Sequence, residues 1–262
     1  MISTSRPSAG VMLVAIDGPR RRNALDLDAF RDLAAAWAEL EQSASIRVAV
    51  VTGNGTDFSS GADLSSIGPG IAQAVCSGRS AADVWRDIHR AVLRKSESTK
   101  PVISAVEGIC FGAGMELAGA TDIRIAGRSA RFALPEVRHG MVASGGSLAR
   151  LARQVPYAAA MEILLTGSEF GAGRMAELGF VNELTDDGGA VDRALAIAKT
   201  LAQNAPTAVR ATKRAVTTGL AGDLTGAYAI EDQVSREVLT GPEAQEGARA
   251  FAERRPPSWR VD

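Results

Sequence analysis

Two glutamates are candidates for moving protons. Glu116 follows the glycine-rich run 108–114, and Glu136 follows Pro135. Two neighbouring carboxyl groups cannot easily both ionise, so such a pair would hold one proton and act as acid and base. Each glutamate also has a plainer interpretation. Glu116 would suit the first turn of a helix through the helix dipole, and Glu136 would suit a solvated loop.

Two small-residue junctions are candidates for binding an anion. The first runs from Phe58 to Leu64 and the second from Gly108 to Leu117, and each lies between a predicted strand and a predicted helix. Amides at a helix start attract anions, and small residues let a ligand approach the backbone. Taken alone, the first junction is equally an N-capped turn. Together they predict two amide donors for one developing oxyanion. A dinucleotide site is disfavoured because Asp122 comes too soon for the ribose-binding acid.

Arginine clusters near both ends are candidates for holding a phosphate-bearing handle. Arg20, Arg21 and Arg22 form the first cluster, and Arg254 with Arg255 lies near Phe251, whose ring could meet an adenine. Such clusters are also commonly just solvated.

The overall composition excludes several classes of protein. Lysine plus arginine number 29 against 30 acidic residues, so no global field attracts nucleic acid or anionic membrane. Cys76 and Cys110 lack the spacing of a disulfide scaffold or zinc site, which favours a reducing cytoplasm. We expect neither a signal peptide nor a transmembrane span, since the most apolar stretch, 101–120, contains charges and glycines.

The hydrophobic pattern predicts an α/β protein that forms one compact unit. The glycine- and proline-rich segment 65–80 is predicted to be a mobile loop. The predicted strands are 11–16, 47–52, 101–106, 122–126 and 181–184, and the main predicted helices are 27–40, 190–203, 208–219 and 224–239.

These segments, in this order and spacing, resemble the crotonase, or enoyl-CoA hydratase/isomerase, family. The resemblance lies in Arg22 to Leu25, Val50 to Gly55, Phe58 to Leu64, Lys100 to Val106, Gly112 to Leu117, Asp122, Phe132 to Glu136, Gly140 to Gly146 and Phe251 to Pro256. It implies a spiral of ββα repeats over residues 1–197 and a C-terminal helical region over 198–262. That region would serve assembly as a homotrimer or a dimer of trimers, and contact with coenzyme A.

The resemblance also implies roles for particular residues. Glu116 and Glu136 match the two catalytic glutamates of the hydratases, and Ala62 and Ala113 match the residues whose amides form the oxyanion hole. The expected ligand is an acyl-CoA thioester, and no metal or further cofactor is implied. Other residues expected to bind the substrate are Arg20, Arg22, Ala24, Asp63, Leu64, Gly112, Ser144 and Phe251.

The leading functional hypothesis is an enoyl-CoA hydratase, a carbon–oxygen lyase that adds water across a 2-enoyl-CoA double bond. Alternatives are an enoyl-CoA isomerase and a non-catalytic acyl-CoA binding protein. Ala143 and Ser144 stand where hydratases of the family usually have Pro-Gly, and the serine could displace the reacting water or reposition Glu136. RNA binding, known in some relatives, is disfavoured by the balanced charge.

Overall fold

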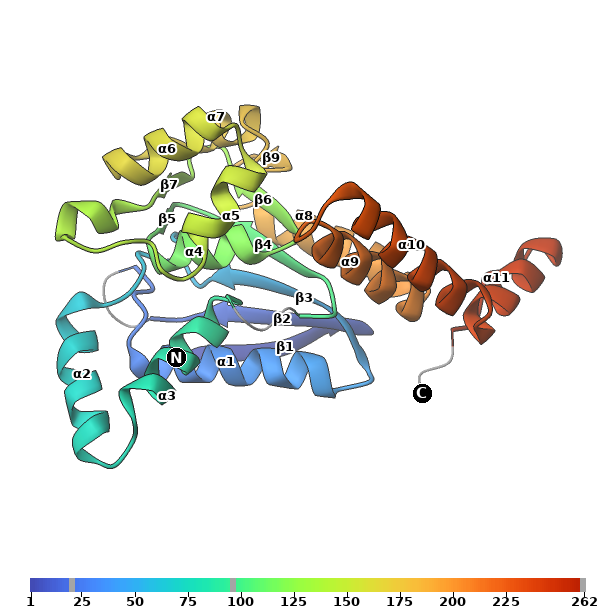
Figure 1. Cartoon of the computed structure of the whole chain (residues 1–262), viewed down its shortest axis with the longest axis horizontal. Helices are drawn as coiled ribbons and strands as arrows, with labels where there is room; N and C mark the ends of the chain where they lie inside the picture. The colour runs from blue at the N-terminus through green and yellow to red at the C-terminus, as the bar shows by residue number, and fades with distance from the viewer. Residues whose placement is uncertain (19–21, 95–97, 260–262) are drawn as a thin grey trace.

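The computed structural model describes residues 1–18, 22–94 and 98–259, and it is built around a twisted sheet (Figure 1). The strand order is β1-β2-β3-β4-β6-β9, with β1 antiparallel to β2 and the remaining pairs parallel. These strands are β1 (Ile2–Ser8), β2 (Gly10–Ile16), β3 (Ile46–Gly53), β4 (Val102–Val106), β6 (Ile123–Gly127) and β9 (Glu183–Thr185).

A second, smaller sheet lies beyond the carboxyl ends of these strands and consists of β5 (Ile109–Phe111), β7 (Arg131–Ala133) and β8 (Phe170–Gly171). Two isolated parallel bridges hold the neighbouring loops: Ser59 pairs with Cys110 of this sheet, and Ala62 pairs with Leu25. The loops that leave β3 and β4 are therefore held side by side.

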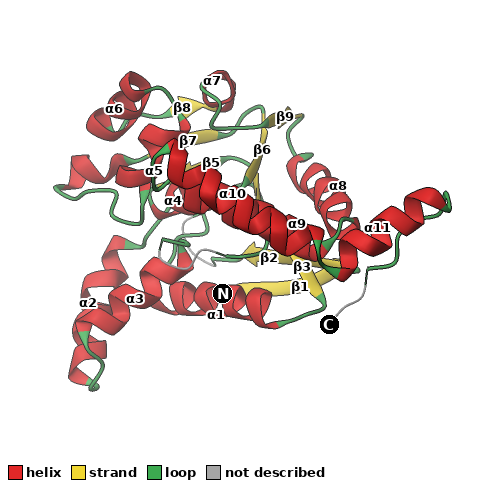
Figure 2. Ribbon diagram, turned by 45° about the vertical axis from the view of Figure 1, so that its right-hand side comes forward, coloured by secondary structure: helices red, strands yellow, loops and turns green. Residues whose placement is uncertain are grey.

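Helices cover both faces of the large sheet (Figure 2). Strand β3 alternates between the two sides: Ala49 and Val51 belong to the core that includes α1, whereas Val48 and Val50 pack with α8. Helices preceding the C-terminal part are α1 (Leu27–Gln42), α2 (Leu64–Cys76), α3 (Ala81–Ala91), α4 (Ala113–Ala120), η1 (Pro135–His139), α5 (Ser147–Gln154), α6 (Tyr157–Thr166), α7 (Ala172–Glu177) and α8 (Ala190–Gln203).

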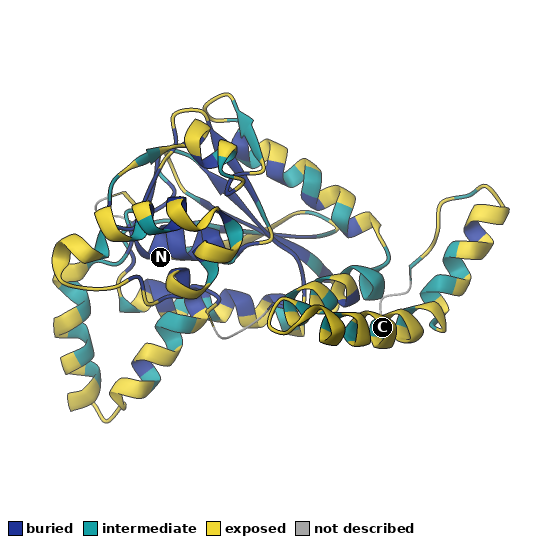
Figure 3. Cartoon of the chain, turned by 45° about the horizontal axis from the view of Figure 1, so that its top comes forward, coloured by how far each residue is buried: buried dark blue, intermediate teal, exposed yellow. Residues whose placement is uncertain are grey.

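The last three helices extend from the body as an arm (Figures 1 and 3). We call α9 (Pro206–Gly219), α10 (Leu224–Leu239) and α11 (Pro242–Ala252) the helical arm. Its described residues are largely exposed, and α10 contains no buried residue. Lys213 ties the arm to the body, since its ammonium lies 2.8 Å from the Asp122 carboxylate. The division into regions 1–197 and 198–262 stays a prediction.

The predicted α/β class and most predicted elements are confirmed, but the mobile loop over 65–80 is wrong. That segment contains helix α2, whose start is capped by Asp63 accepting a hydrogen bond from the Ser65 amide at 3.0 Å. Gly70 passes so close to α1 that an added methyl group would lie 2.8 Å from Leu27. Gly70 thus permits the helix to pack closely against α1, and Pro69 lies within the same helix. Among the described residues, no helix is both long and apolar enough to cross a membrane.

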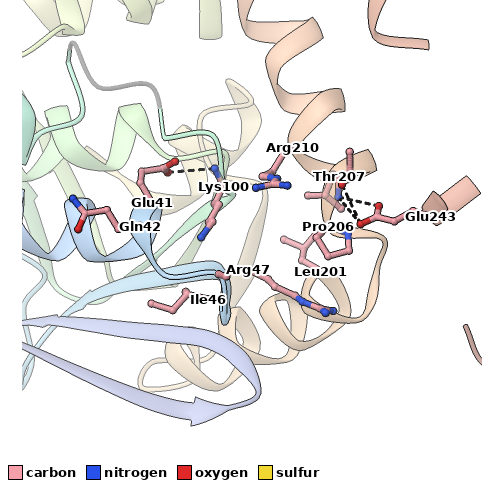
Figure 4. A pocket seen from close by; sticks show the side chains of 12 residues that line it. Glu41, Gln42, Ile46, Arg47, Lys100, Leu201, Pro206, Thr207, Arg210 and Glu243 are labelled. Carbon is pink, nitrogen blue, oxygen red and sulfur yellow. Dashed lines mark hydrogen bonds between the residues drawn. The ribbon is translucent and has the colours of Figure 1, made fainter. Parts of the chain in front are cut away.

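Lys100 links the end of α1 to the central sheet. Its side chain is buried, and its ammonium donates to the carbonyl oxygens of Leu40 at 2.6 Å and Ser43 at 2.7 Å. Carbonyls at a helix C-terminus lack partners within the helix, and a cation there is favourable. Burial lowers the pKa of Lys100. A cavity of about 260 Å³ opens beside it, between α1, the start of α9 and Glu243 (Figure 4).

Replacing Lys100 by methionine is expected to destabilise the fold, because the two carbonyls at the end of α1 lose a charged donor. A loss of about 2–3 kcal/mol is typical for a hydrogen bond of this kind. The urea midpoint, followed at fixed protein concentration, measures it. Lys199→Met, at an exposed position on α8, is the matched control. Equal midpoints for the two variants would show that Lys100 does not stabilise α1.

Candidate active site

The backbone amides of Ala62 and Ala113 are both available to a ligand. Leu25 bonds to the residues on either side of Ala62, donating to Gly61 at 2.8 Å and accepting from Asp63 at 2.8 Å. Ala113 is the first residue of α4, where a helix leaves its amides unpaired. Within the described part of the chain, neither amide donates a hydrogen bond. The two predicted oxyanion-hole donors are therefore free.

Glycines bring these two amides close together. Gly61 has φ +92°, and a methyl group placed on it would lie 2.8 Å from the Phe111 oxygen and 3.2 Å from the Ala113 nitrogen. Gly112, immediately before α4, has φ +51°. Both conformations favour glycine, and at Gly61 no side chain fits between the crossing segments. The amides consequently belong to adjacent backbone segments.

Buried side chains fix the loop that carries Ala62. Ser59 donates to the carbonyl of Asn23 at 2.8 Å and accepts from the Gly61 amide at 3.1 Å. The Asn23 side chain donates in turn to the carbonyls of Asn54 at 2.9 Å and Asp57 at 2.7 Å. Neither Asn23 nor Ser59 was predicted from the sequence to have a role in the site. The usable signal was an asparagine in a turn, a residue that tolerates the φ of +59° observed here.

Glu116 lies in the first turn of α4 and is only 6% exposed. Its carboxylate accepts a hydrogen bond from the Gly145 amide at 2.6 Å. Gly145 touches the carboxylate so closely that an added methyl group would collide with it. Burial, and secondarily the charge of Glu136, raises the pKa of Glu116 to about 7. The plainer interpretation of Glu116 as a surface capping residue is therefore wrong.

Glu136 reaches the same region from η1. It is half-buried, and its Oε2 atom is buried with no hydrogen-bond partner among the described residues. Its Oε1 atom is 3.4 Å from where a methyl group on Gly112 would lie, beside Ala113. Burial raises the pKa of Glu136, which is not the behaviour of a solvated loop charge. An unpartnered buried oxygen beside the free amides is suited to a ligand or a reacting water.

The negative charge of Glu136 acts on Glu116, so the protonation of Glu116 depends on the state of its neighbour. Arg150 on α5 also acts on Glu116 and partly offsets the rise in its pKa. Near neutral pH the Glu116 carboxyl can therefore hold a proton, with Glu136 in the same region. The available chemistry is proton transfer beside a site for a developing oxyanion.

Four other residues predicted to bind the substrate lie in the segments around the amides and the glutamates. Asp63 caps α2, with its carboxylate 2.6 Å from the Ser65 hydroxyl, and the exposed Leu64 begins that helix. Gly112 lies at the crossing of the two segments, and Ser144 is exposed in the turn that precedes Gly145.

The residues predicted to contact coenzyme A are more scattered. Arg22 is exposed, with its guanidinium 3.8 Å from Asp57, and Ala24 is half-buried beside Leu25. Arg20 lies outside the described residues. Phe251 is 88% exposed on α11, and this chain does not bring it to the carboxyl pair (Figure 1). Its role in binding stays a prediction.

Neither glutamate lines the cavity beside Lys100, which is therefore distinct from this site. Nor do the described residues place three acidic, histidine or cysteine side chains together in a group that could hold a metal ion.

Glu136→Gln is expected to lower the pKa of Glu116, because it removes a neighbouring negative charge. The value should fall below about 7 yet stay above 4.5, since burial is the larger cause of the shift. A difference infrared titration of the carboxyl band, assigned by its loss in Glu116→Gln, measures the change. Glu162→Gln, on the exposed side of α6, should leave it unaltered. An unchanged titration in Glu136→Gln would show that the two carboxyl groups are uncoupled.

Comparison with known proteins supports the family resemblance. A family model described as enoyl-CoA hydratase/isomerase matches residues 6–261. The enoyl-CoA hydratase EchA19 of Mycobacterium tuberculosis is 35% identical over 250 residues, covering 95% of this chain and 92% of the relative. The mevalonyl-coenzyme A hydratase of Aspergillus fumigatus is 32% identical over 258 residues, covering 98% of this chain and 93% of that protein.

Solved structures agree with the sequence comparison. An enoyl-CoA hydratase from Mycobacterium tuberculosis has a TM-score of 0.87 and 37% identity, with 100% of this chain and 99% of the other covered. An enoyl-CoA hydratase from Bacillus anthracis has a TM-score of 0.89 and 29% identity, with the same coverage. The expected crotonase-like α/β fold is confirmed, and the chain belongs to the enoyl-CoA hydratase/isomerase family.

Proposed function

We propose that this protein is an enoyl-CoA hydratase, which adds water across the C2=C3 bond of a 2-enoyl-CoA thioester. The observation that carries the proposal is the pair of free amides, on Ala62 and Ala113, beside two carboxyl groups whose pKa values are both raised. The named hydratases among its relatives support the same reaction class.

The two amides would bind the thioester oxygen. As water adds at C3, negative charge develops on this oxygen, and two fixed donors stabilise it without reorganisation. Loss of one such donor typically costs about 3 kcal/mol of transition-state stabilisation. Backbone amides serve here, so the alanine side chains at positions 62 and 113 are compatible with the role.

The carboxyl pair would manage the protons. The ionised carboxylate accepts a proton from water as the water oxygen bonds to C3, and the protonated carboxyl donates its proton to C2. One carboxyl group gains a proton and the other loses one, so the total charge of the pair is unchanged. The two glutamates have then exchanged their protonation states. Positioned proton transfer of this kind contributes about 100-fold or more to a rate. The proposed route uses no metal or redox cofactor, and coenzyme A enters as part of the substrate.

The geometry favours hydration over isomerisation of an enoyl-CoA. Isomerisation needs one group that carries a proton between two carbons, whereas hydration uses a base for water and an acid for carbon. Glu136 lies beside the segment that carries the Ala113 amide, Glu116 lies in the first turn of the helix that Ala113 begins, and the unpartnered Oε2 of Glu136 leaves an acceptor for a water molecule. Isomerase activity remains the second candidate reaction.

Ser144 is the feature that favours a non-catalytic acyl-CoA binding protein. It lies in the turn whose next residue, Gly145, donates to Glu116. Ala143 is buried in this turn while Ser144 is exposed, so the serine hydroxyl is free to meet a ligand or the reacting water. If it displaces that water, thioester binding would persist without turnover.

We also propose that Arg20, Arg22 and Ala24 contact the coenzyme A moiety, and that the protein assembles as a trimer or a dimer of trimers in the cytoplasm. Exposed apolar side chains on the helical arm support assembly, because single chains rarely leave such surfaces uncovered. These side chains include Leu220, Leu224, Tyr228 and Leu239. Phe251, on the same arm, could then meet a ligand held by a neighbouring subunit.

The test is the loss of 2-enoyl absorbance with crotonyl-CoA and with a longer 2-enoyl-CoA. Wild type should hydrate at least one of them, and Glu116→Gln and Glu136→Gln should each reduce kcat by about 100-fold or more, since each removes one proton-transfer step. Binding of the saturated acyl-CoA, measured by calorimetry, should persist in both variants.

Glu162→Gln is the matched control for these substitutions, and it should leave kcat unchanged. Ser144→Gly restores the residue usual in the hydratases. Wild type that binds acyl-CoA without turnover, together with a gain of activity in Ser144→Gly, would contradict the hydratase proposal and support the binding protein.

A further inference from the structure

Arg150 joins the turn beside Glu116 to a distant segment of the chain. It lies on α5, directly after the turn 140–146, and its guanidinium donates to the Leu93 carbonyl at 2.7 Å. Leu93 follows α3, is buried, and has the unusual φ of +54° for a residue that is not glycine. A bond from Arg150 therefore holds a backbone carbonyl in a constrained position.

The guanidinium also packs against the turn itself. A methyl group on Gly146 would lie 2.9 Å from the Arg150 Cζ atom, and Gly146 adopts φ +121°, which favours glycine. The Arg150 amide donates to the Gly146 carbonyl at 3.0 Å. The neighbouring Gly145 amide is the group that donates to Glu116. Arg150 thus braces Gly146, whose neighbour Gly145 binds the Glu116 carboxylate.

Charge adds to this mechanical role. Arg150 is the cation that acts on Glu116, where it opposes the effects of burial and of Glu136. Other charged groups line the cavity next to Arg150 and are engaged elsewhere. Of these groups, Lys213 pairs with the Asp122 carboxylate. Arg124 donates to the carbonyls of Phe180 and Thr121. Arg153 donates to the Ala149 carbonyl, and Arg94 bonds to the His89 ring.

We propose that Arg150 is a positioning residue of the active site, which braces the turn against Leu93, keeps the Gly145 amide on Glu116 and supplies a compensating positive charge. It would act on the reaction through the turn and through its charge. The proposal deepens the proposed hydratase function, since it concerns the same carboxyl pair. It nevertheless predicts a property of the resting protein that does not depend on the reaction.

The first measurement follows the carboxyl band of Glu116 by infrared titration of the ligand-free protein. Arg150→Gln should move its midpoint above the wild-type value, because loss of a cation disfavours the carboxylate. Arg150→Lys, which keeps the charge and can still donate to Leu93, should bring the midpoint back toward wild type. Arg153→Gln, one turn further along the exposed side of α5, should leave it unchanged.

The second measurement is kinetic and applies where wild type hydrates a 2-enoyl-CoA. At pH 7.5, Arg150→Gln should lower kcat by about tenfold while KM stays within about twofold, because a misplaced proton-transfer group slows chemistry more than binding. Lysine should restore part of the lost kcat. A wild type without hydratase activity would refute the proposed reaction and still leave the titration as a test of Arg150.

Arg150→Met replaces the glutamine variant if the latter does not fold, since it keeps an unbranched apolar stem and removes the charged end. The proposal is overturned if the uncharged variant titrates like wild type. It is equally overturned if lysine fails to shift the midpoint back from the value of the uncharged variant.

Discussion

The proposed chemistry of this molecule depends on two backbone segments that pass each other with no side chain between them. Gly61 and Gly112 make the crossing possible, and the backbone of Ser59 bonds to Ile109 and Phe111, the neighbours of Cys110 in β5. Because the amides of Ala62 and Ala113 emerge on these segments, their separation is set by backbone contacts and not by mobile side chains. Donors fixed in this way need no reorganisation when charge develops on a ligand.

Around that crossing, the protein places acidic groups where burial works against their ionisation. Glu116 comes from α4 and Glu136 from η1, so two elements that are separate in sequence deliver one proton-holding pair. The turn at Gly145 supplies a hydrogen bond to the first carboxylate, and Arg150 supplies a cation. The protonation state of Glu116 and Glu136 therefore depends on how η1 and α5 pack against α4.

Much of the fold could be predicted from local pattern, because β3 and β4 are buried apolar runs and α1 has clear helical periodicity. The glutamates and the small-residue junctions were also visible as residue types. Helix α2 was missed because its glycines and Pro69 are typical of loops, and the contact of Gly70 with Leu27 is a tertiary effect. The edge strand β1 was missed because its residues are mostly exposed and polar.

The part of the site that sequence could not supply is the set of contacts between distant segments. Asn23 bonds to Asn54 and Asp57, and Arg150 bonds to Leu93. Nothing in a local pattern distinguishes these side chains from ordinary turn or surface residues. Their roles depend on which loops meet, and that follows from the order of strands in the sheet.

The raised pKa of Glu116 also carries a cost for the fold itself. A carboxyl whose pKa is higher in the folded chain than in the unfolded one favours folding while it is protonated, and this advantage disappears as pH rises through about 7. The difference from 4.5 corresponds to roughly 3 kcal/mol, a sizeable part of the stability of a typical domain. At neutral and alkaline pH the protein therefore keeps a conflict between stability and activity at its centre. Selection for thermal resistance alone would tend to replace this carboxyl with an uncharged side chain.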